Sequence, residues 1–507
     1  MIITKNYFEK YTDSETFSKL KIDKTIPLFL DKIEEQYKDL VAVGSSLKNV
    51  TYKELISDVK KTNQVLSNEQ ILVKSNVGVI CNNNYDFVKT ALGVMAYGAV
   101  ATLLPVQLDE KTIFGCCMKY QLTCLFYEKA IAEKIEFAKK MAPMVKFIEI
   151  DEYNVEEKEY NYEIKETDPA CIVLTGGTTG KSKGAILSHK AVMTGTLNGT
   201  YGVKNVFHDV YYSIMPLTHV FGLVRNLLTC LYSGSMIYFC SNMKEMFKEM
   251  QKLHPTILVA VPALAELFLN LVKQFGLNML GGAVNTIICG GASVPPYLTI
   301  EFRKLGINFC PGYGLTELAN LVSGNPAGDE KPSSVGLLYP HQEIKLVNDE
   351  LWIKGPNLLD AYYNEPEENQ TAFEDGWFKT GDLVKLDENG FLYITGRIKD
   401  IIVLSNGENV SPAYIEDKVN ALPIIQDSLV TAEVNEFGAE ILQVEVVLRQ
   451  AVIAPLGITN LQEYVEQEIA KVNETLFDYE RISKVVIRTE DFQRSPSMKI
   501  IRPRKAL

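Results

Sequence analysis

The sequence lacks the cysteine and charge patterns that mark several common classes of protein. Its nine cysteines are scattered, only Cys116 and Cys117 are adjacent, and no two stand in a CxxC spacing, which argues against a zinc site and a disulfide framework. Scattered cysteines in odd number favour a reducing, cytoplasmic compartment. Acidic residues outnumber basic ones by 63 to 51, and the formal net charge of −12 argues against non-specific binding to nucleic acid or to an anionic membrane.

Long apolar runs are absent too. The N-terminus (MIITKNYFEK) carries charges early and has no apolar signal-peptide core. The longest uncharged stretch, Thr90–Leu108, is interrupted by Gly93, Gly98 and Pro105, which favours a buried helix running into a strand over a membrane span. Because the chain has 507 residues, 47% of them hydrophobic, we expect several domains with ample core.

Helical and strand patterns alternate along the first part of the chain. Apolar residues recur at helical spacing in Ile26–Gln36, Tyr52–Leu66 and Tyr85–Tyr97. Short apolar runs typical of strands are Val77–Cys81, Ala170–Leu174, Tyr212–Met215, Thr256–Val261, Thr286–Cys289 and Asn308–Cys310. Four of these runs lead into loops rich in Gly, Pro and polar residues. Since open α/β sheets bind ligands beyond the carboxyl ends of their strands, the pattern predicts an α/β fold with one large site.

The pattern changes after about residue 340. Paired strands are predicted at Ile344–Val347 and Leu351–Lys354 around an Asn-Asp turn, with another strand at Phe391–Thr395. Further on, the sequence predicts helices at Ser411–Leu422 and Leu461–Asn473 and a strand at Leu442–Leu448. A small C-terminal domain is therefore expected from about residue 400.

One loop has the composition of a phosphate site. Residues 174–184 read LTGGTTGKSKG, between two apolar runs. Gly180, Lys181 and Ser182 supply the end of a Walker A motif, but the Gly that this motif requires five positions earlier is Thr175. Glycines let backbone N–H groups approach an anion, and the hydroxyls and ammonium groups add donors and charge. The composition indicates a phosphate loop of another kind.

Five further segments, in the same order along the chain, resemble motifs of the adenylate-forming superfamily, which includes acyl-CoA synthetases, adenylation domains of peptide synthetases and beetle luciferases. They read PLTH at 216–219, GYGLTE at 312–317, WFKTGD at 377–382, GRIKD at 396–400 and SMKIIR at 497–502. Gly176 stands where many members have Ser, a variant similar to fatty acyl-CoA ligases. The resemblance spans most of the chain and displaces the Walker interpretation.

The resemblance implies a domain plan: an N-terminal adenylation domain at 1–395 with sheets and a small barrel-like part, a hinge at 396–400 around Lys399, and a small mobile α+β domain at 401–507 that carries the catalytic lysine. It also implies ATP and Mg²⁺ as cofactors, with CoA or the phosphopantetheine of a carrier protein as the acceptor.

The resemblance also implies a role for each residue according to its position in these motifs. The phosphate loop comprises Thr175, Gly176, Gly177, Thr178, Thr179, Gly180, Lys181 and Lys183. The adenine and its surroundings would be held by Gly290, Gly291, Ala292, Gly312, Tyr313 and Gly314, and the ribose by Asp382 and Arg397. Thr316 would contact the α-phosphate and Glu317 the Mg²⁺; read without the family, Glu317 could equally be a buried carboxylate paired with a lysine. Lys499 would bridge the carboxylate and the α-phosphate, although Met498 stands where the family usually has Gly.

The expected reaction joins a carboxylic acid to AMP with release of pyrophosphate and then transfers the acyl group to a thiol. Members that activate amino acids place an Asp near the PLxH-like segment, and here Leu217–Leu223 contains no carboxylate. A fatty or aryl acid is expected, because a buried ammonium group would lack a partner. His219, Val220 and Phe221, with Gly290 and Gly312, would line its pocket, unless His219 is a core histidine. Gly407 would admit the pantetheine arm. A stand-alone enzyme that loads a carrier protein and a non-catalytic sensor are the alternatives.

Overall fold

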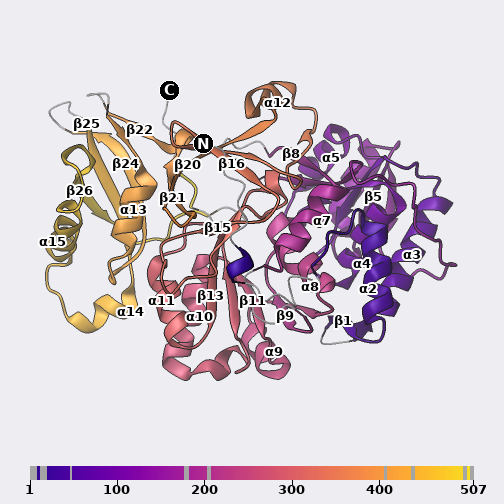
Figure 1. Cartoon of the computed structure of the whole chain (residues 1–507), viewed down its shortest axis with the longest axis horizontal. Helices are drawn as coiled ribbons and strands as arrows, with labels where there is room; N and C mark the ends of the chain where they lie inside the picture. The colour runs from indigo at the N-terminus through magenta and orange to yellow at the C-terminus, as the bar shows by residue number, and fades with distance from the viewer. Residues whose placement is uncertain are drawn as a thin grey trace.

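The N-terminal part of the chain is built on a seven-stranded sheet (purple in Figure 1). The computed structural model describes residues 8–11, 20–45, 48–175, 182–201, 207–404, 408–435, 440–494 and 500–502. The strands lie in the order β18 (Ala361–Tyr362), β8 (Gly184–Ser188), β7 (Pro169–Leu174), β4 (Val100–Leu104), β3 (Asn76–Ile80), β5 (Cys124–Tyr127) and β6 (Lys146–Glu149). From β7 to β6 all neighbours are parallel, whereas β8 and β18 are antiparallel additions.

Helices accompany this sheet: α2 (Ile26–Tyr37), α3 (Tyr52–Asn68), α4 (Tyr85–Tyr97), α5 (Glu110–Lys119), α6 (Ala132–Met141) and α7 (His189–Asn198). Helix α4 forms where the sequence predicts it because both ends are fixed locally. The Asn84 side chain accepts the Phe87 N–H, and Gly98 ends the helix at φ 90°, in the left-handed region. Ten consecutive residues from Phe87 to Ala96 are buried, so the uncharged stretch is a core helix followed by β4, as predicted.

A second, fourteen-stranded sheet forms the middle of the molecule. Its path is β16 (Glu343–Val347), β17 (Glu350–Lys354), β20 (Trp377–Leu386), β21 (Phe391–Arg397), β15 (Gly336–Leu338), β14 (Ser323–Gly324), β13 (Asn308–Tyr313), β12 (Thr286–Cys289), β11 (Ile257–Ala260), β9 (Val210–Ser213), β10 (Met236–Phe239), β1 (Val41–Gly44) and β2 (Asn49–Thr51), with β19 (Phe373–Glu374) beside β20. Along this path, each neighbouring pair in the run β1, β10, β9, β11, β12, β13 is parallel. Each neighbouring pair from β13 through β14, β15, β21, β20 and β17 to β16 is antiparallel. Helices α8 (Thr229–Tyr232), α9 (Met246–Leu253), α10 (Pro262–Phe275) and α11 (Pro296–Lys304) join its parallel strands.

The predicted hairpin around the Asn-Asp turn is confirmed. Val347 pairs with Glu350, and Asn348 and Asp349 between them have φ values of 50° and 64°. Two consecutive left-handed residues match the right-handed twist of the flanking strands, and Asn and Asp tolerate this conformation better than most residues.

The strand predicted at Tyr212–Met215 lies two residues earlier, as β9. Residues 215–217 leave the sheet because the Asn83 side chain binds their backbone: its Nδ2 donates to the Met215 carbonyl (2.8 Å), and its Oδ1 accepts the Leu217 N–H (2.9 Å). A residue far away in the sequence thus ends the strand.

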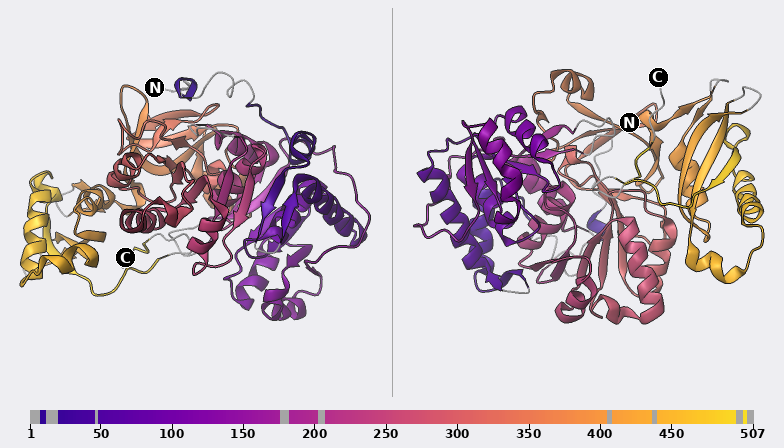
Figure 2. Two further views of the ribbon diagram at one scale, coloured as in Figure 1. Left: turned by 90° about the horizontal axis from the view of Figure 1, so that it is seen from below. Right: turned by 180° about the vertical axis from the view of Figure 1, so that it is seen from behind.

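The C-terminal part has its own hydrophobic core, which includes Ile415, Val444 and Val465. It contains β22 (Ile402–Val403), β23 (Asn409–Val410), α13 (Pro412–Asn420), β24 (Ile425–Val434), β25 (Glu440–Leu448), α14 (Gln450–Ile453), α15 (Leu461–Asn473) and β26 (Ile482–Ile487). In every view it lies at the opposite end of the molecule from the seven-stranded sheet (Figure 1, Figure 2). The predicted combination of a large N-terminal α/β part and a smaller C-terminal part is confirmed.

Polar side chains join the C-terminal part to α10 and α11. Asp417 accepts a hydrogen bond from Ser293 Oγ (2.8 Å), and Arg449 pairs with Glu266 (2.6 Å) and lies 3.4 Å from the Tyr297 hydroxyl. Partly exposed polar contacts of this kind are weak. In the described parts of the chain, no helix has both the length and the apolarity needed to cross a bilayer.

A buried histidine gives the fold a testable pH dependence. His189, at the start of α7, is fully buried, and its Nδ1 accepts the Ile26 N–H (3.2 Å). Burial lowers its pKa from 6.5 to about 4, so between these values the unfolded chain binds the proton and the folded chain does not. This contribution should reduce the free energy of unfolding by about 2 kcal/mol as the pH falls from 7.5 to 5.

His189→Asn keeps an acceptor for the Ile26 N–H and removes the titrating ring. Urea unfolding of both proteins at the two pH values should show a smaller pH dependence in the variant. An identical pH dependence would show that His189 is not the responsible group.

Candidate active site

Loops from both sheets meet at one region. The residues that follow β12 and β13 (Gly290, Gly291, Gly314) line one cavity together with Phe221 and Arg225, which come from the loop and π-helix after β9. The loop after β7 reaches the same region through Lys183, whose ammonium group lies 5.0 Å from the centre of the Tyr362 ring. Tyr362 in turn donates to Glu317, just beyond β13. The loops after β7, β12 and β13 therefore meet in this region, and the segment after β9 contributes Phe221 and Arg225 from its π-helix.

The base of the phosphate-type loop is closed by its own hydrogen bonds. The Thr175 N–H donates to the Lys183 carbonyl (2.8 Å), and Ser182 Oγ donates to the Thr175 carbonyl (2.9 Å). The loop joins the antiparallel strands β7 and β8, whereas a Walker A loop leads from a strand into a helix. The strand that follows it rules out the Walker interpretation. Residues Gly176, Gly177, Thr178, Thr179, Gly180 and Lys181 lie outside the described residues.

Glu317 lies in a short 3₁₀ turn, η5 (Thr316–Leu318), after β13. One of its carboxylate oxygens accepts the Tyr362 hydroxyl (2.7 Å), and the Glu317 carbonyl accepts the Leu359 N–H (2.7 Å). Among the described residues no lysine or arginine forms an ion pair with it, because Lys183, which contacts the same tyrosine ring, pairs with Glu368 (2.6 Å). The carboxylate retains acceptor capacity for a cation. The structure thus gives no support to the alternative of a lysine-paired buried glutamate.

A second cluster joins Asp382, Arg397 and Tyr313. Asp382 and Arg397 are direct cross-strand partners on β20 and β21, and the guanidinium donates to both carboxylate oxygens. The Tyr313 hydroxyl donates to the same carboxylate. Asp382 is only 2% exposed, and Thr380 Oγ1 holds its backbone N–H (3.1 Å). Burial lowers the pKa of Arg397, but the Asp382 carboxylate outweighs it and leaves the pKa raised. Such a carboxylate, held by rigid partners, is suited to accept hydroxyl groups of a ligand.

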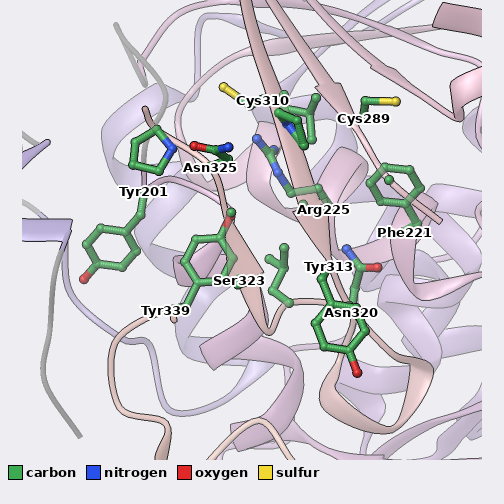
Figure 3. Close-up of a pocket in the computed structure, with 18 of the residues that line it drawn as sticks. Tyr201, Phe221, Arg225, Cys289, Cys310, Tyr313, Asn320, Ser323, Asn325 and Tyr339 are labelled. Carbon is green, nitrogen blue, oxygen red and sulfur yellow. The ribbon is translucent and has the colours of Figure 1, made fainter. Parts of the chain in front are cut away.

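Figure 3 shows the cavity beside Tyr313. Its volume is about 40 Å³. Its wall runs from Gly290, Gly312 and Tyr313 past Arg225 to Asn325 and Tyr339. Phe8 and Tyr201 close one side, where the Phe8 ring stacks on the Tyr339 ring at 4.9 Å. The lining combines aromatic and apolar side chains with the polar groups of Arg225, Asn320 and Asn325.

Other residues singled out in the sequence lie around this centre. Phe221, Gly290, Gly291, Gly312, Tyr313 and Gly314 line the cavity, whereas His219 and Val220 are not among its lining residues. Gly291, Ala292 and Lys399 are exposed, and Thr316 is half-buried next to Glu317. Gly407 and Lys499 lie outside the described residues. The Gly314 position has no room for a side chain, because a Cβ there would lie 1.3 Å from the Asn320 carbonyl oxygen.

Sequence reasoning missed Tyr362, Glu368 and Arg225. Nothing in the local sequence marks Tyr362 or Glu368, since their partners Glu317 and Lys183 are distant in the chain. Arg225 did carry a signal: it is the one charged residue in the stretch from Val220 to Tyr232. A lone charge within an apolar stretch is expensive to bury and points to a function.

Comparison with known proteins agrees with this arrangement. Residues 30–363 match the model of the AMP-binding enzyme family, and residues 399–506 match the AMP-binding enzyme C-terminal domain. The chain is 32% identical over 308 residues to a long-chain-fatty-acid–CoA ligase of Yersinia pestis; this match covers 57% of the chain and 54% of the relative, so the chain spans about half the length of that relative. A 2-succinylbenzoate–CoA ligase of Bacillus thuringiensis is 24% identical, with 94% of the chain and 98% of the relative covered.

Solved structures share the fold. The o-succinylbenzoate CoA synthetase of Bacillus subtilis, in complex with its acyl-adenylate intermediate, superimposes with a TM-score of 0.78 at 23% identity, covering 94% of this chain and 97% of that one. An anthranilate CoA ligase in complex with anthranoyl-AMP gives 0.82 at 18% identity, covering 96% and 97%. With both family models matched in order across nearly the whole sequence, the chain belongs to the AMP-binding enzyme family.

Proposed function

We propose that the protein is an AMP-forming acid–thiol ligase, which activates a carboxylic acid as its acyl-adenylate, releases pyrophosphate and transfers the acyl group to CoA. The observation that carries the proposal is that Glu317, the Asp382–Arg397–Tyr313 cluster and the base of the β7–β8 loop lie near one another, linked through Tyr362 and β13, and that Tyr313 also lines the cavity. Glu317 offers a ligand for a cation, Asp382 offers an acceptor for the ribose hydroxyls, and the β7–β8 loop offers a binding site for phosphates.

The residues position the reactants more than they react with them. Asp382 accepts the two ribose hydroxyls, and Arg397 and Tyr313 keep that carboxylate in place. Lys183 and Thr175 fix the base of the loop that binds the β- and γ-phosphates. Lys499 donates to the carboxylate and the α-phosphate while charge builds up on their oxygens. Because a carboxylate is a poor electrophile and AMP a good leaving group, alignment and charge stabilisation supply most of the catalysis.

A magnesium ion fits this donor set. Mg²⁺ is usually held by one or two carboxylates together with substrate phosphates, and among the described residues no group of three or more metal-binding side chains forms a separate site. Glu317, with no cationic partner among the described residues, would hold the ion against the triphosphate. When bound, it would neutralise negative charge on the phosphates.

The second step requires the C-terminal part to move. Its polar contacts with α10 and α11 are few, and Lys399 is exposed at the start of this part. We take residues 1–395 as the adenylation domain, 396–400 as the hinge and 401–507 as the mobile lid, with Gly407 beside the incoming pantetheine arm. All nine cysteines are free, which supports a reducing, cytoplasmic location.

Product analysis tests the proposal. Purified protein with Mg-ATP, CoA and a panel of carboxylic acids should form AMP, pyrophosphate and acyl-CoA. Among the described lining residues there is no Asp or Glu to pair with an ammonium group, so free amino acids should be poor substrates. Formation of ADP and phosphate, or an amino acid activated better than any other acid, would contradict the proposal. If acyl transfer required a carrier protein instead of CoA, only the identity of the thiol acceptor would have to be corrected.

A further inference from the structure

Arg225 is a buried cation in the wall of the active-site cavity. It belongs to the π-helix η3 (Phe221–Leu228), is 2% exposed and is among the largest fully buried side chains of the described chain. Phe221, one turn earlier, lines the same cavity. In Figure 3 the Arg225 side chain stands in the middle of the lining residues. Segments of π-helix are rare and occur often at functional sites.

Among the described residues the guanidinium lacks the acidic partner that such burial normally requires. No described carboxylate forms an ion pair with Arg225, and its Nη1 is buried with no hydrogen-bond acceptor among the described residues. Its neighbours are neutral: the guanidinium donates a hydrogen bond to the Tyr211 side chain, and Cys310 and Tyr339, both uncharged in their ordinary state, lie close enough for its charge to affect their pKa values. An arginine cannot give up its proton, so a neutral setting leaves the whole charge uncompensated.

Tyr211 satisfies part of the guanidinium but leaves its charge uncompensated, and the described cavity wall adds no carboxylate. The Tyr339 hydroxyl makes no hydrogen bond to a described residue, and burial raises its pKa to about 12, although Arg225 acts in the opposite direction. It therefore stays protonated and available to donate. Asn325 is held by other partners, because its Oδ1 accepts the Ala327 N–H (3.0 Å) and its Nδ2 donates to the Lys331 and Ser334 carbonyls. A site made of an arginine and a tyrosine hydroxyl is complementary to an anion.

The position of this site determines which anion it meets. Gly290, Gly312 and Tyr313, which lie where the adenylate is proposed, form one part of the cavity wall, and Arg225, Asn325 and Tyr339 form another. A carboxylic acid activated beside Tyr313 would point its other end toward Arg225. The cavity volume of about 40 Å³ holds roughly three water molecules, which suits the polar end of a short acid.

From this geometry we infer that the substrate is a short dicarboxylic acid: one carboxylate is adenylated, and Arg225, with the Tyr339 hydroxyl, binds the other. This inference rests on the proposed function and adds a second carboxylate to the acid expected there. Arg225 thereby determines specificity and takes no part in the bond changes. An apolar acid of the same length would leave the guanidinium buried and unpaired, a penalty that discriminates strongly against it.

Matched substrate pairs test the inference. Pyrophosphate release is measured with dicarboxylic acids from malonate to pimelate and with the monocarboxylic acid of equal chain length in each pair. For the best pair, kcat/KM of the wild type should favour the diacid by roughly 10²-fold or more, the range expected when one partner of a buried charge pair is removed. Arg225→Met should lose this preference and accept the monocarboxylic acid as well as or better than the diacid. Arg225→Lys should keep part of the preference, and Tyr339→Phe should reduce it less.

Each outcome decides one question. A wild type that prefers monocarboxylic acids overturns the inference and leaves the ligase function standing. An Arg225→Met variant whose activity falls by the same factor with both acids of a pair has the same consequence. A wild type that activates no acid counts against the proposed function. If thermal melting shows that Arg225→Met does not fold, the inference is judged from the substrate pairs measured with the wild type and with Tyr339→Phe. The Tyr339→Phe variant keeps the ring and its stacking on Phe8.

Discussion

Glu317→Gln should lower the rate of acyl-adenylate formation by roughly 10²–10³-fold while the protein stays folded. The substitution keeps an oxygen that can accept the Tyr362 hydroxyl, so the local packing is preserved, and it removes the negative charge that no described cation balances. Only an interaction with a bound cation depends on that charge. The measurement is pyrophosphate release with saturating ATP and the best acid, at several Mg²⁺ concentrations.

Glu368→Gln is the matched control. Glu368 lies in the same region and pairs with Lys183, but its side chain is 40% exposed and it carries no proposed catalytic role. The control should change the rate by less than tenfold, as is typical of exposed ion pairs. Equal losses in the two variants would mean that Glu317 acts only as a structural partner of Tyr362.

Lys499→Ala should separate the two half-reactions. The ammonium group is needed only while the carboxylate attacks the α-phosphate, so adenylation should fall by roughly 10²–10³-fold. Thioester formation from presynthesised acyl-AMP should be largely unaffected. Gly407→Leu should do the opposite by blocking the thiol arm, and Lys399→Pro should impair mainly the second step by restricting the hinge torsion.

A lysine elsewhere on the same domain serves as the control. Lys471 on α15 is exposed and pairs with Glu468, so Lys471→Ala should leave both half-reactions unchanged. If Lys499→Ala reduced both steps by the same factor in a folded protein, the proposal that the C-terminal domain presents different groups in turn would have to be abandoned.

The sequence was sufficient wherever structure is set locally. Helix α4 and strand β12 begin and end at the predicted residues, α4 because Asn84 and Gly98 fix its ends, and the hairpin at Asn348 and Asp349 follows from turn chemistry. The end of β9 was misplaced because it depends on Asn83, more than a hundred residues away in the chain.

In the candidate site, too, motifs predicted some residues, whereas other contacts depend on residues that are distant in the chain. Tyr313, Glu317, Asp382 and Arg397 were identified from motifs, and the structure brings Tyr313, Asp382 and Arg397 together. That Tyr362 would bind Glu317, or that Arg225 would be buried without an acidic partner among the described residues, depends on how the two sheets meet. No local pattern encodes that arrangement. The buried Arg225 in the cavity wall is the feature of the site that the motifs did not predict.

The central claim, activation of a carboxylate through an acyl-adenylate, is tested most directly by isotope transfer. In this chemistry a carboxylate oxygen attacks the α-phosphate, pyrophosphate leaves, and the later attack of the thiol on the acyl carbon breaks the acyl–oxygen bond. That oxygen remains on the phosphate of AMP. With an acid labelled with ¹⁸O in both carboxylate oxygens, mass spectrometry after complete conversion to acyl-CoA should find a single ¹⁸O atom in AMP and none in pyrophosphate. Label in inorganic phosphate together with ADP, or unlabelled AMP, would contradict the account.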